Sequence, residues 1–132
     1  IQNELPNIPR LGMYMFLKNS FETVSWYGNG PEESYWDRKT GQKIREYSGK
    51  IKEQFHTYSR PQETGNKTAV RWMQLASENM TLKVSSEEQL LNASVWPFNM
   101  KEIDFNSDEA IKSASGASTI VILFIIVYEQ PA

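Results

Sequence analysis

The chain has 132 residues, of which 39% are hydrophobic and 12% aromatic, which suits one globular domain with a core and argues against a disordered tail. Its 14 basic and 16 acidic residues leave a net charge of −2, so no overall positive field favours nucleic acid as a partner. The absence of cysteine and the single histidine exclude disulfide scaffolds, thiol nucleophiles, cysteine-ligated metals and histidine-rich metal sites.

We expect a single domain over residues 1–132, with residues 1–9 as a linker. These first residues are polar and interrupted by prolines, and the chain begins neither with methionine nor with a signal peptide. The sequence therefore reads as an excised piece of a longer protein.

Strand signals begin at residue 11. The continuous apolar run of residues 11–17 predicts a strand buried on both faces. Residues 23–27 are β-branched and aromatic and predict a second strand, which we expect the turn-forming residues 28–31 to end. Residues 50–58 alternate only weakly between apolar and polar side chains, which we interpret as an exposed strand.

The middle of the chain predicts a hairpin. Residues 69–75 and 80–84 have the composition of strands, and the short polar link of residues 76–79 joins them. In residues 85–88 serine precedes acidic side chains, a pattern that favours a capped helical turn.

Three further elements are expected in the last third of the chain. Residues 90–98 alternate and predict a strand, in which Pro97 indicates an edge or an end. Residues 106–112 combine an N-cap candidate, early acids and a late lysine, which predicts a short helix. Residues 119–128 are too short for the roughly 20 apolar residues of a membrane helix, and their β-branched content predicts a central strand buried on both faces.

Few residues suggest catalytic chemistry. Glu32 with Glu33, and Glu87 with Glu88, resemble the carboxylate pairs of glycosidases, but neighbours on a strand point to opposite faces, so we interpret both pairs as solvated loop charges. His56 titrates in the range of a general base, but no nucleophile or orienting acid accompanies it in the sequence, and a structural or exposed histidine is the simpler interpretation. No phosphate-binding loop, zinc-protease motif or nucleophile elbow occurs.

Two aromatic residues, Tyr35 and Trp36, lie in a loop-like stretch where burial is not automatic. Their rings are candidates for stacking on the faces of sugars, so we predict a carbohydrate contact at these positions. The alternative is that they belong to the core, as most large aromatic side chains do.

An ordered set of motifs runs through the first half of the chain. It consists of P-R-x-G at residues 9–12, W-x-G-x-G-P-x-E-x-Y-x-D-R at 26–38, Y-x-x-P-Q-E-x-G at 58–65 and V-R-W at 70–72. This order resembles the C-terminal, small-chain domain of the large bacterial β-galactosidases of glycoside hydrolase family two.

The likeness is strong over residues 9–75 and looser over residues 76–112. It ends near Ser115-Gly116, so residues 117–132 depart from the family pattern.

The resemblance implies an all-β fold with one or two short helices, a partial β-supersandwich of the galactose mutarotase type. It also implies a parent enzyme that hydrolyses terminal β-galactosides with retention, in the bacterial cytoplasm or periplasm, using two glutamates on a separate barrel domain. None of the acids here lies in the family's catalytic motif, so we expect no catalytic residue in this chain. Magnesium and sodium are expected only in the parent's other domains, and no metal site or cofactor is expected here.

The resemblance also assigns structural roles to nine residues. We expect three glycines to supply turn conformations, four charged residues to form ion pairs that fix the long loop, and two tryptophans to lie in the core. In that order they are Gly28, Gly30 and Gly65; Asp37, Arg38, Glu63 and Arg71; and Trp26 and Trp72.

Three functions stay open at this point. The first is a scaffold and substrate-pocket accessory of a β-galactosidase, partnered by the rest of that enzyme and by galactosides, with no activity of its own. The second is a stand-alone carbohydrate-binding module that acts through Tyr35 and Trp36. The third is a self-associating β protein in which Ile120 to Tyr128 pair between chains. We expect neither nucleic acid nor a membrane as a partner.

Overall fold

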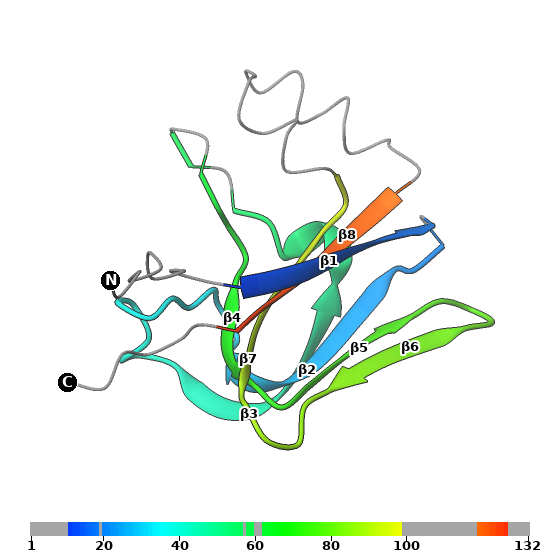
Figure 1. The fold of residues 1–132 in the computed structure, drawn as a ribbon. Helices are drawn as coiled ribbons and strands as arrows, with labels where there is room; N and C mark the ends of the chain where they lie inside the picture. The colour runs from blue at the N-terminus through cyan, green and yellow to red at the C-terminus, as the bar shows by residue number, and fades with distance from the viewer. Residues whose placement is uncertain (1–10, 19, 57, 60–61, 99–118, 127–132) are drawn as a thin grey trace, which may run out of the picture.

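The computed structural model describes residues 11–18, 20–56, 58–59 and 62–98 in full and residues 119–126 as backbone (Figure 1). Its elements are β1 (Leu11–Lys18), β2 (Thr23–Gly30), β3 (Lys43–Lys50), the 3₁₀ turn η1 (Ile51–Glu53), β4 (Lys67–Val70), β5 (Trp72–Ala76), β6 (Thr81–Ser85), β7 (Leu91–Trp96) and β8 (Thr119–Ile126). The predicted helix at residues 106–112 and the linker at residues 1–9 lie outside the described residues.

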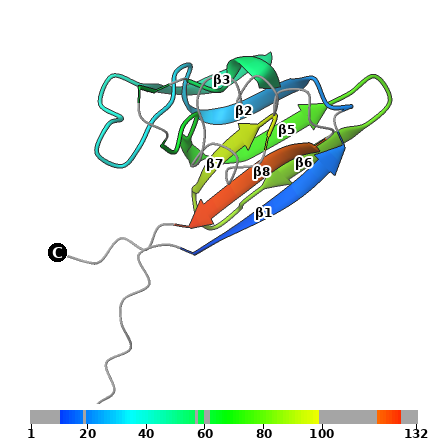
Figure 2. The same ribbon diagram turned by 90° about the horizontal axis from the view of Figure 1, so that it is seen from above.

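The strands form two antiparallel sheets that face each other. One sheet has the order β1-β8-β7-β4, and the other has the order β3-β2-β5-β6. Figure 2 shows β7, β8 and β1 side by side in one layer and β3, β2 and β5 in the other. The prediction of an all-β fold is therefore confirmed, and its architecture is a sandwich of two sheets.

The core lies between the sheets and is built by alternate residues of the central strands. Val24 and Trp26 point inward from β2, as Met73 and Leu75 do from β5, and each is at most 2% exposed. β7 covers them from the other sheet. Burial follows a period of two along β5 and most of β2, as the pleat of a strand requires.

β1 confirms a predicted strand but corrects its predicted burial. Leu11, Met13, Tyr14 and Phe16 are each more than half exposed. The reason is topological, because β1 is the last strand of its sheet and pairs only with β8. An apolar run predicts a strand but does not show whether a neighbour covers it.

β8 is a central strand, as predicted. All eight of its residues pair with β1, and Val121 to Ile125 also pair with β7. Over that stretch both edges of β8 are already paired. The predicted pairing of Ile120 to Tyr128 between two chains therefore has no free backbone edge at Val121 to Ile125. The predicted burial of its side chains lies outside what the structure describes.

The chain between residues 28 and 58 corrects two predictions. β2 runs through the glycines that were expected to end it and stops at Gly30. The predicted strand at residues 50–58 is wrong, because the chain turns there in η1 and buries Ile51. The strand that was missed is β3, whose first four side chains are all exposed. An edge strand without a buried face shows little alternation.

The predicted strand at residues 69–75 is two strands in different sheets. β4 ends at Val70 and β5 begins at Trp72, and Ala69 adopts a left-handed φ of 54° where the chain changes sheet. The predicted hairpin is confirmed as β5 and β6. No helical turn forms at residues 85–88, although the Ser86 hydroxyl accepts a hydrogen bond from the Gln89 N–H at 3.3 Å. Pro97 follows the end of β7, as expected.

Candidate functional site

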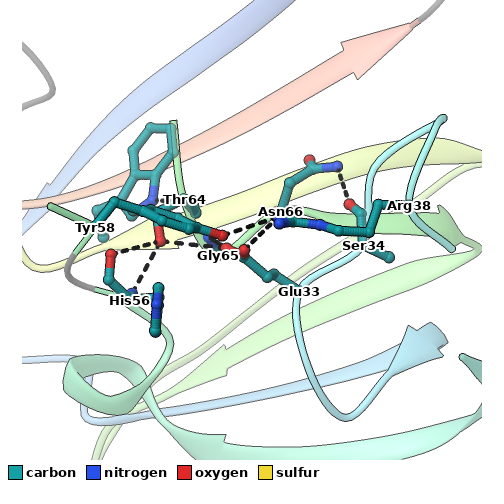
Figure 3. A network of polar contacts seen from close by, with 9 residues as sticks. Glu33, Ser34, Arg38, His56, Tyr58, Thr64, Gly65 and Asn66 are labelled. Carbon is teal, nitrogen blue, oxygen red and sulfur yellow. Dashed lines mark hydrogen bonds and ion pairs between the residues drawn. The ribbon is translucent and has the colours of Figure 1, made fainter. Parts of the chain in front are cut away.

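The carboxylate of Glu33 links the loop of residues 31–42 to the segment before β4 (Figure 3). Glu33 Oε1 accepts a hydrogen bond from Arg38 Nη2 at 2.6 Å, and Oε2 accepts one from the Gly65 N–H at 2.8 Å. The hydroxyl of Thr64 lies 3.3 Å from the same Oε2. The Glu33 side chain is only 15% exposed. Sequence reasoning treated Glu33 as a solvated loop charge, and the structure corrects this.

Arg38 closes the outer side of this network. Its guanidinium also donates to the hydroxyl of Tyr58 at 2.8 Å and lies 5.1 Å from the centre of the Tyr35 ring. Arg38 therefore makes an ion pair, but with Glu33, five residues before it. Asp37 is exposed and makes no ion pair with any other described residue. Glu63 is half-buried, and its charge contributes to raising the pKa of Tyr35.

A second, buried set of hydrogen bonds lies beneath the first. Ser34 pairs its backbone N–H with the Asn66 carbonyl at 2.7 Å, and the Asn66 amide donates back to the Ser34 carbonyl at 2.8 Å. The hydroxyls of Ser34 and Thr68 lie 2.9 Å apart, and Asn29 donates to that of Thr68 at 2.8 Å. These four residues are at most 8% exposed, so their polar groups need hydrogen-bond partners within the protein, and this network supplies them.

Thr64 links the network around Glu33 to His56 and to β7. Its hydroxyl accepts a hydrogen bond from the His56 N–H at 2.9 Å, and its carbonyl accepts one from the Trp96 indole at 2.8 Å. The imidazole of His56 is exposed and packs edge-on against the Tyr58 ring at 4.5 Å. His56 therefore enters the network through its backbone, which favours the structural interpretation over a general base.

The three motif glycines fall into two classes. Gly65 has a φ of 71°, and a Cβ there would lie 2.2 Å from the Gln54 carbonyl oxygen. Gly28 and Gly30 do not form turns, which corrects the prediction, because both lie within β2. These two positions favour glycine because neighbouring atoms leave little room for a side chain. A Cβ on Gly28 would come within 3.0 Å of the Val70 Cα, and one on Gly30 within 2.7 Å of the Tyr47 ring.

The two motif tryptophans lie on opposite faces of their sheet. Trp26 is 2% exposed and stacks on Tyr47. Trp72 is only half-buried, with the ammonium of Lys83 4.7 Å from its ring centre, so its predicted place in the core is wrong. The reason is the pleat, because the inward-facing positions of β5 are those of Met73 and Leu75. Arg71, also predicted to form an ion pair, makes none with another described residue.

Instead of a carboxylate, Arg71 contacts a carbonyl and a ring. Its guanidinium donates to the Ala69 carbonyl at 2.9 Å and lies 5.0 Å from the centre of the Tyr27 ring. Arg71 therefore stabilises the crossing from β4 to β5 rather than the long loop.

Lys67 is a charged residue that sequence reasoning missed. It is 4% exposed, donates to the Pro31 carbonyl at 3.0 Å and places its ammonium 4.8 Å from the centre of the Trp26 ring. Burial lowers the pKa of Lys67 to about 8, although the nearby carboxylates of Glu32 and Glu33 oppose the shift. Lys67 thus ties the start of the loop to β4.

Tyr35 and Trp36 do not form a joint aromatic surface. The backbones of Tyr35 and Arg38 exchange two hydrogen bonds, N–H to carbonyl in each direction, and so close a tight turn. Trp36 lies in this turn and is 76% exposed. Tyr35 is half-buried, its ring lies against Arg38, and its buried hydroxyl has no hydrogen-bond partner among the described residues. Burial, with the charge of Glu33, raises the pKa of Tyr35. Of these two predicted contact residues, only Trp36 is exposed enough for a sugar to stack freely on its ring.

The described ranges contain neither a metal-binding cluster nor a membrane-spanning helix. No group of three or more carboxylate or imidazole side chains within these ranges is arranged to hold a metal ion. Nor does that part of the chain contain a helix with the length and apolar character needed to cross a membrane.

Comparison with known proteins identifies the family. The model of the β-galactosidase small chain matches residues 1–116. This chain belongs to the β-galactosidase small-chain family. The match ends where the likeness in the sequence ended, near Ser115-Gly116, so β8 lies beyond it.

Curated relatives of this family member include bacterial and yeast β-galactosidases. That of Priestia megaterium is 49% identical over 74 residues, which are 56% of this chain and 7% of the relative. That of Lactobacillus delbrueckii is 38% identical over 97 residues, 74% of this chain and 10% of the relative. That of Kluyveromyces lactis is 36% identical over 107 residues, 80% of this chain and 10% of the relative. The chain thus spans a tenth or less of the length of these relatives.

Proposed function

We propose that this chain is a structural part of a β-galactosidase whose catalytic residues lie elsewhere in that enzyme. The family match over residues 1–116 supports the parent activity, hydrolysis of β-galactosides. The use of Glu33 supports the structural role. The two oxygens of Glu33 accept hydrogen bonds from Arg38 and from the Gly65 N–H, so this carboxylate joins two segments of the chain.

What Glu33 holds in place is the loop of residues 31–42. It joins Arg38 within the loop to Gly65 outside it, and the buried Ser34–Asn66 pair repeats the same link one residue later. A loop fixed at two adjacent points is suited to present its tip in one orientation. In this proposal the remaining domains of the enzyme, and the galactoside they bind, are the partners of that tip.

A chimeric enzyme tests the proposal directly. The 74 aligned residues of the Priestia megaterium β-galactosidase are replaced by those of this chain, and hydrolysis of o-nitrophenyl β-galactoside is measured. We expect the chimera to fold and to keep the kcat and KM of its parent. A folded chimera without activity would contradict the proposal, as would hydrolysis by the purified 132-residue chain alone.

A carbohydrate contact at Trp36 is the second candidate function. Its support is the exposure of the indole at the tip of a rigid turn, where a sugar face can stack on it. Titration of the 132-residue chain with galactose, followed by tryptophan fluorescence, tests it with Trp36→Ala as the control. A saturable change that disappears in Trp36→Ala supports the contact, and the absence of any saturable change contradicts a stand-alone binding module.

A further inference from the structure

Each sheet of the sandwich ends in two edge strands, and three of these four edges carry features that discourage pairing with another chain. β4 has only four residues and an irregular register with β7. β6 has five residues and a lysine, Lys83, at its middle. β3 is longer but carries four charged side chains. Short length, irregularity and charge are the usual protections of a sheet edge.

β1 has none of these protections. It is eight residues long, pairs with β8 without interruption, and bears a single charge, Lys18, at its last position. Four of the eight large hydrophobic side chains that are exposed in the described part of the chain lie on β1: Leu11, Met13, Tyr14 and Phe16. An exposed, regular and apolar edge is a template for one more strand.

We propose that β1 pairs with β1 of a second copy of this chain, antiparallel, about a twofold axis perpendicular to the sheet. The contact joins the two β1-β8-β7-β4 sheets into one continuous sheet. This surface is distinct from the loop of residues 31–42, so the proposal does not depend on the proposed function.

The strand itself fits a copy of itself. A twofold axis perpendicular to the sheet leaves each side chain on the same face of the sheet in both copies. Even-numbered residues therefore lie opposite even-numbered residues, and odd opposite odd. The overlap of the two strands is largest when the axis passes beside the middle of β1, at Tyr14 or Met15. Centred on Met15, the pairing sets Tyr14 opposite the second copy's Phe16, a favourable aromatic pair.

Charge also favours this arrangement. Antiparallel pairing places Lys18 at opposite ends of the interface, near Gly12 or beyond Leu11 of the other copy, whereas parallel pairing would set the two lysines side by side. The net charge of −2 adds little repulsion between whole chains.

Sedimentation velocity on the 132-residue chain tests the pairing. A contact of one strand per copy is small, so we expect a reversible monomer–dimer equilibrium with a dissociation constant between about 1 μM and about 1 mM. Met13→Lys should shift it to monomer. Met80→Lys is a matched control, because Met80 is 62% exposed, close to the 59% of Met13, but lies in the β5–β6 turn. Equal effects of the two variants would overturn the proposal, as would a strict monomer, which would leave β1 to another part of a β-galactosidase.

A spin label gives a readout that does not depend on the stability of Met13→Lys. Because the chain has no cysteine, Tyr14→Cys provides a single attachment point. Either centre of the pairing brings the two position-14 Cβ atoms within about 8 Å, so dipolar broadening should grow with concentration. The same label at Met80→Cys should show none. Broadening at position 80 but not at position 14 would place the contact elsewhere and overturn the proposal.

Discussion

Glu33 and Gly65 lie 32 residues apart in the sequence, yet the carboxylate of one accepts a hydrogen bond from the backbone N–H of the other at 2.8 Å. The same carboxylate holds Arg38 at 2.6 Å on its other oxygen. The Glu33 carboxylate thus helps to fix the loop of residues 31–42 against the segment that leads into β4, and its contribution to stability is directly measurable.

Glu33→Gln should lower the free energy of unfolding by about 2 kcal/mol, because an amide keeps the shape of the side chain but loses its charge and sets an NH₂ group against donors. Urea unfolding of the 132-residue chain measures the change. The control is Glu88→Gln, because Glu88 is exposed, and we expect it to stay within about 0.5 kcal/mol. Equal losses in both variants would mean that Glu33 clamps nothing.

Gly65→Ala should destabilise the fold by about 2 kcal/mol or more. An L side chain is strained at a φ of 71°, and the new Cβ would meet the Gln54 carbonyl oxygen at 2.2 Å. Gly41→Ala is the matched control, because nothing lies within 4 Å of a Cβ at Gly41. The two thermal midpoints should therefore differ clearly, and a Gly65→Ala variant as stable as Gly41→Ala would disprove the argument.

Lys67 should make stability rise with pH between 7 and 9.5. Its pKa is about 8 in the folded chain against an ordinary 10.5, so the unfolded chain binds more protons in this window and folding gains as the proton is lost. The expected gain is on the order of 2 kcal/mol at pH 9.5 relative to pH 7. Above pH 10 the raised pKa of Tyr35 acts in the opposite direction, because only the unfolded chain then loses the phenolic proton.

The measurement is the difference between the parent chain and Lys67→Met at each pH, since the variant removes the titrating group and keeps an unbranched apolar stem. The parent's stability should climb relative to that of the variant across the window. A constant difference from pH 7 to pH 9.5 would show that Lys67 keeps an ordinary pKa when folded.

Leu123→Pro should unfold the β1-β8-β7-β4 sheet. Leu123 pairs with Tyr14 on one side and Ser94 on the other, so a proline there interrupts a strand with two neighbours, at a cost of about 3 kcal/mol or more. Leu123→Val retains strand propensity and serves as the control. Hydrogen exchange should show β1 losing protection in the proline variant alone, and unchanged protection there would contradict the central position of β8.

The strands that the sequence predicted best are those that pack against neighbours. β7 and the central position of β8 followed from alternation and from a β-branched run, because such patterns reflect burial on a sheet. β3 was missed because its side chains are mostly exposed and its edge position leaves no buried face to read. The prediction that β1 is buried was wrong because its apolar composition suggests the interior, whereas its position is at the edge of a sheet.

The site was predictable only in part. The motifs located the loop and contain Arg38, Glu33 and Gly65, but nothing in their spacing showed that the Glu33 carboxylate contacts the other two residues, one of them 32 residues away. Distances of that kind are set by the fold and leave no trace in local spacing. Lys67 was missed for the same reason, because its surroundings include Trp26 of β2, in the other sheet, and Pro31, in the loop that follows β2.

The family match stops at residue 116, whereas the strand that joins β1 to β7 begins at Thr119. The matched residues therefore supply three strands of the β1-β8-β7-β4 sheet, namely β1, β7 and β4, and the fourth strand, β8, lies beyond them. β1 reaches the rest of its sheet through β8, because β8 pairs with β1 on one side and with β7 on the other. A chain cut at the end of the family match would lose the strand that connects β1 to β7.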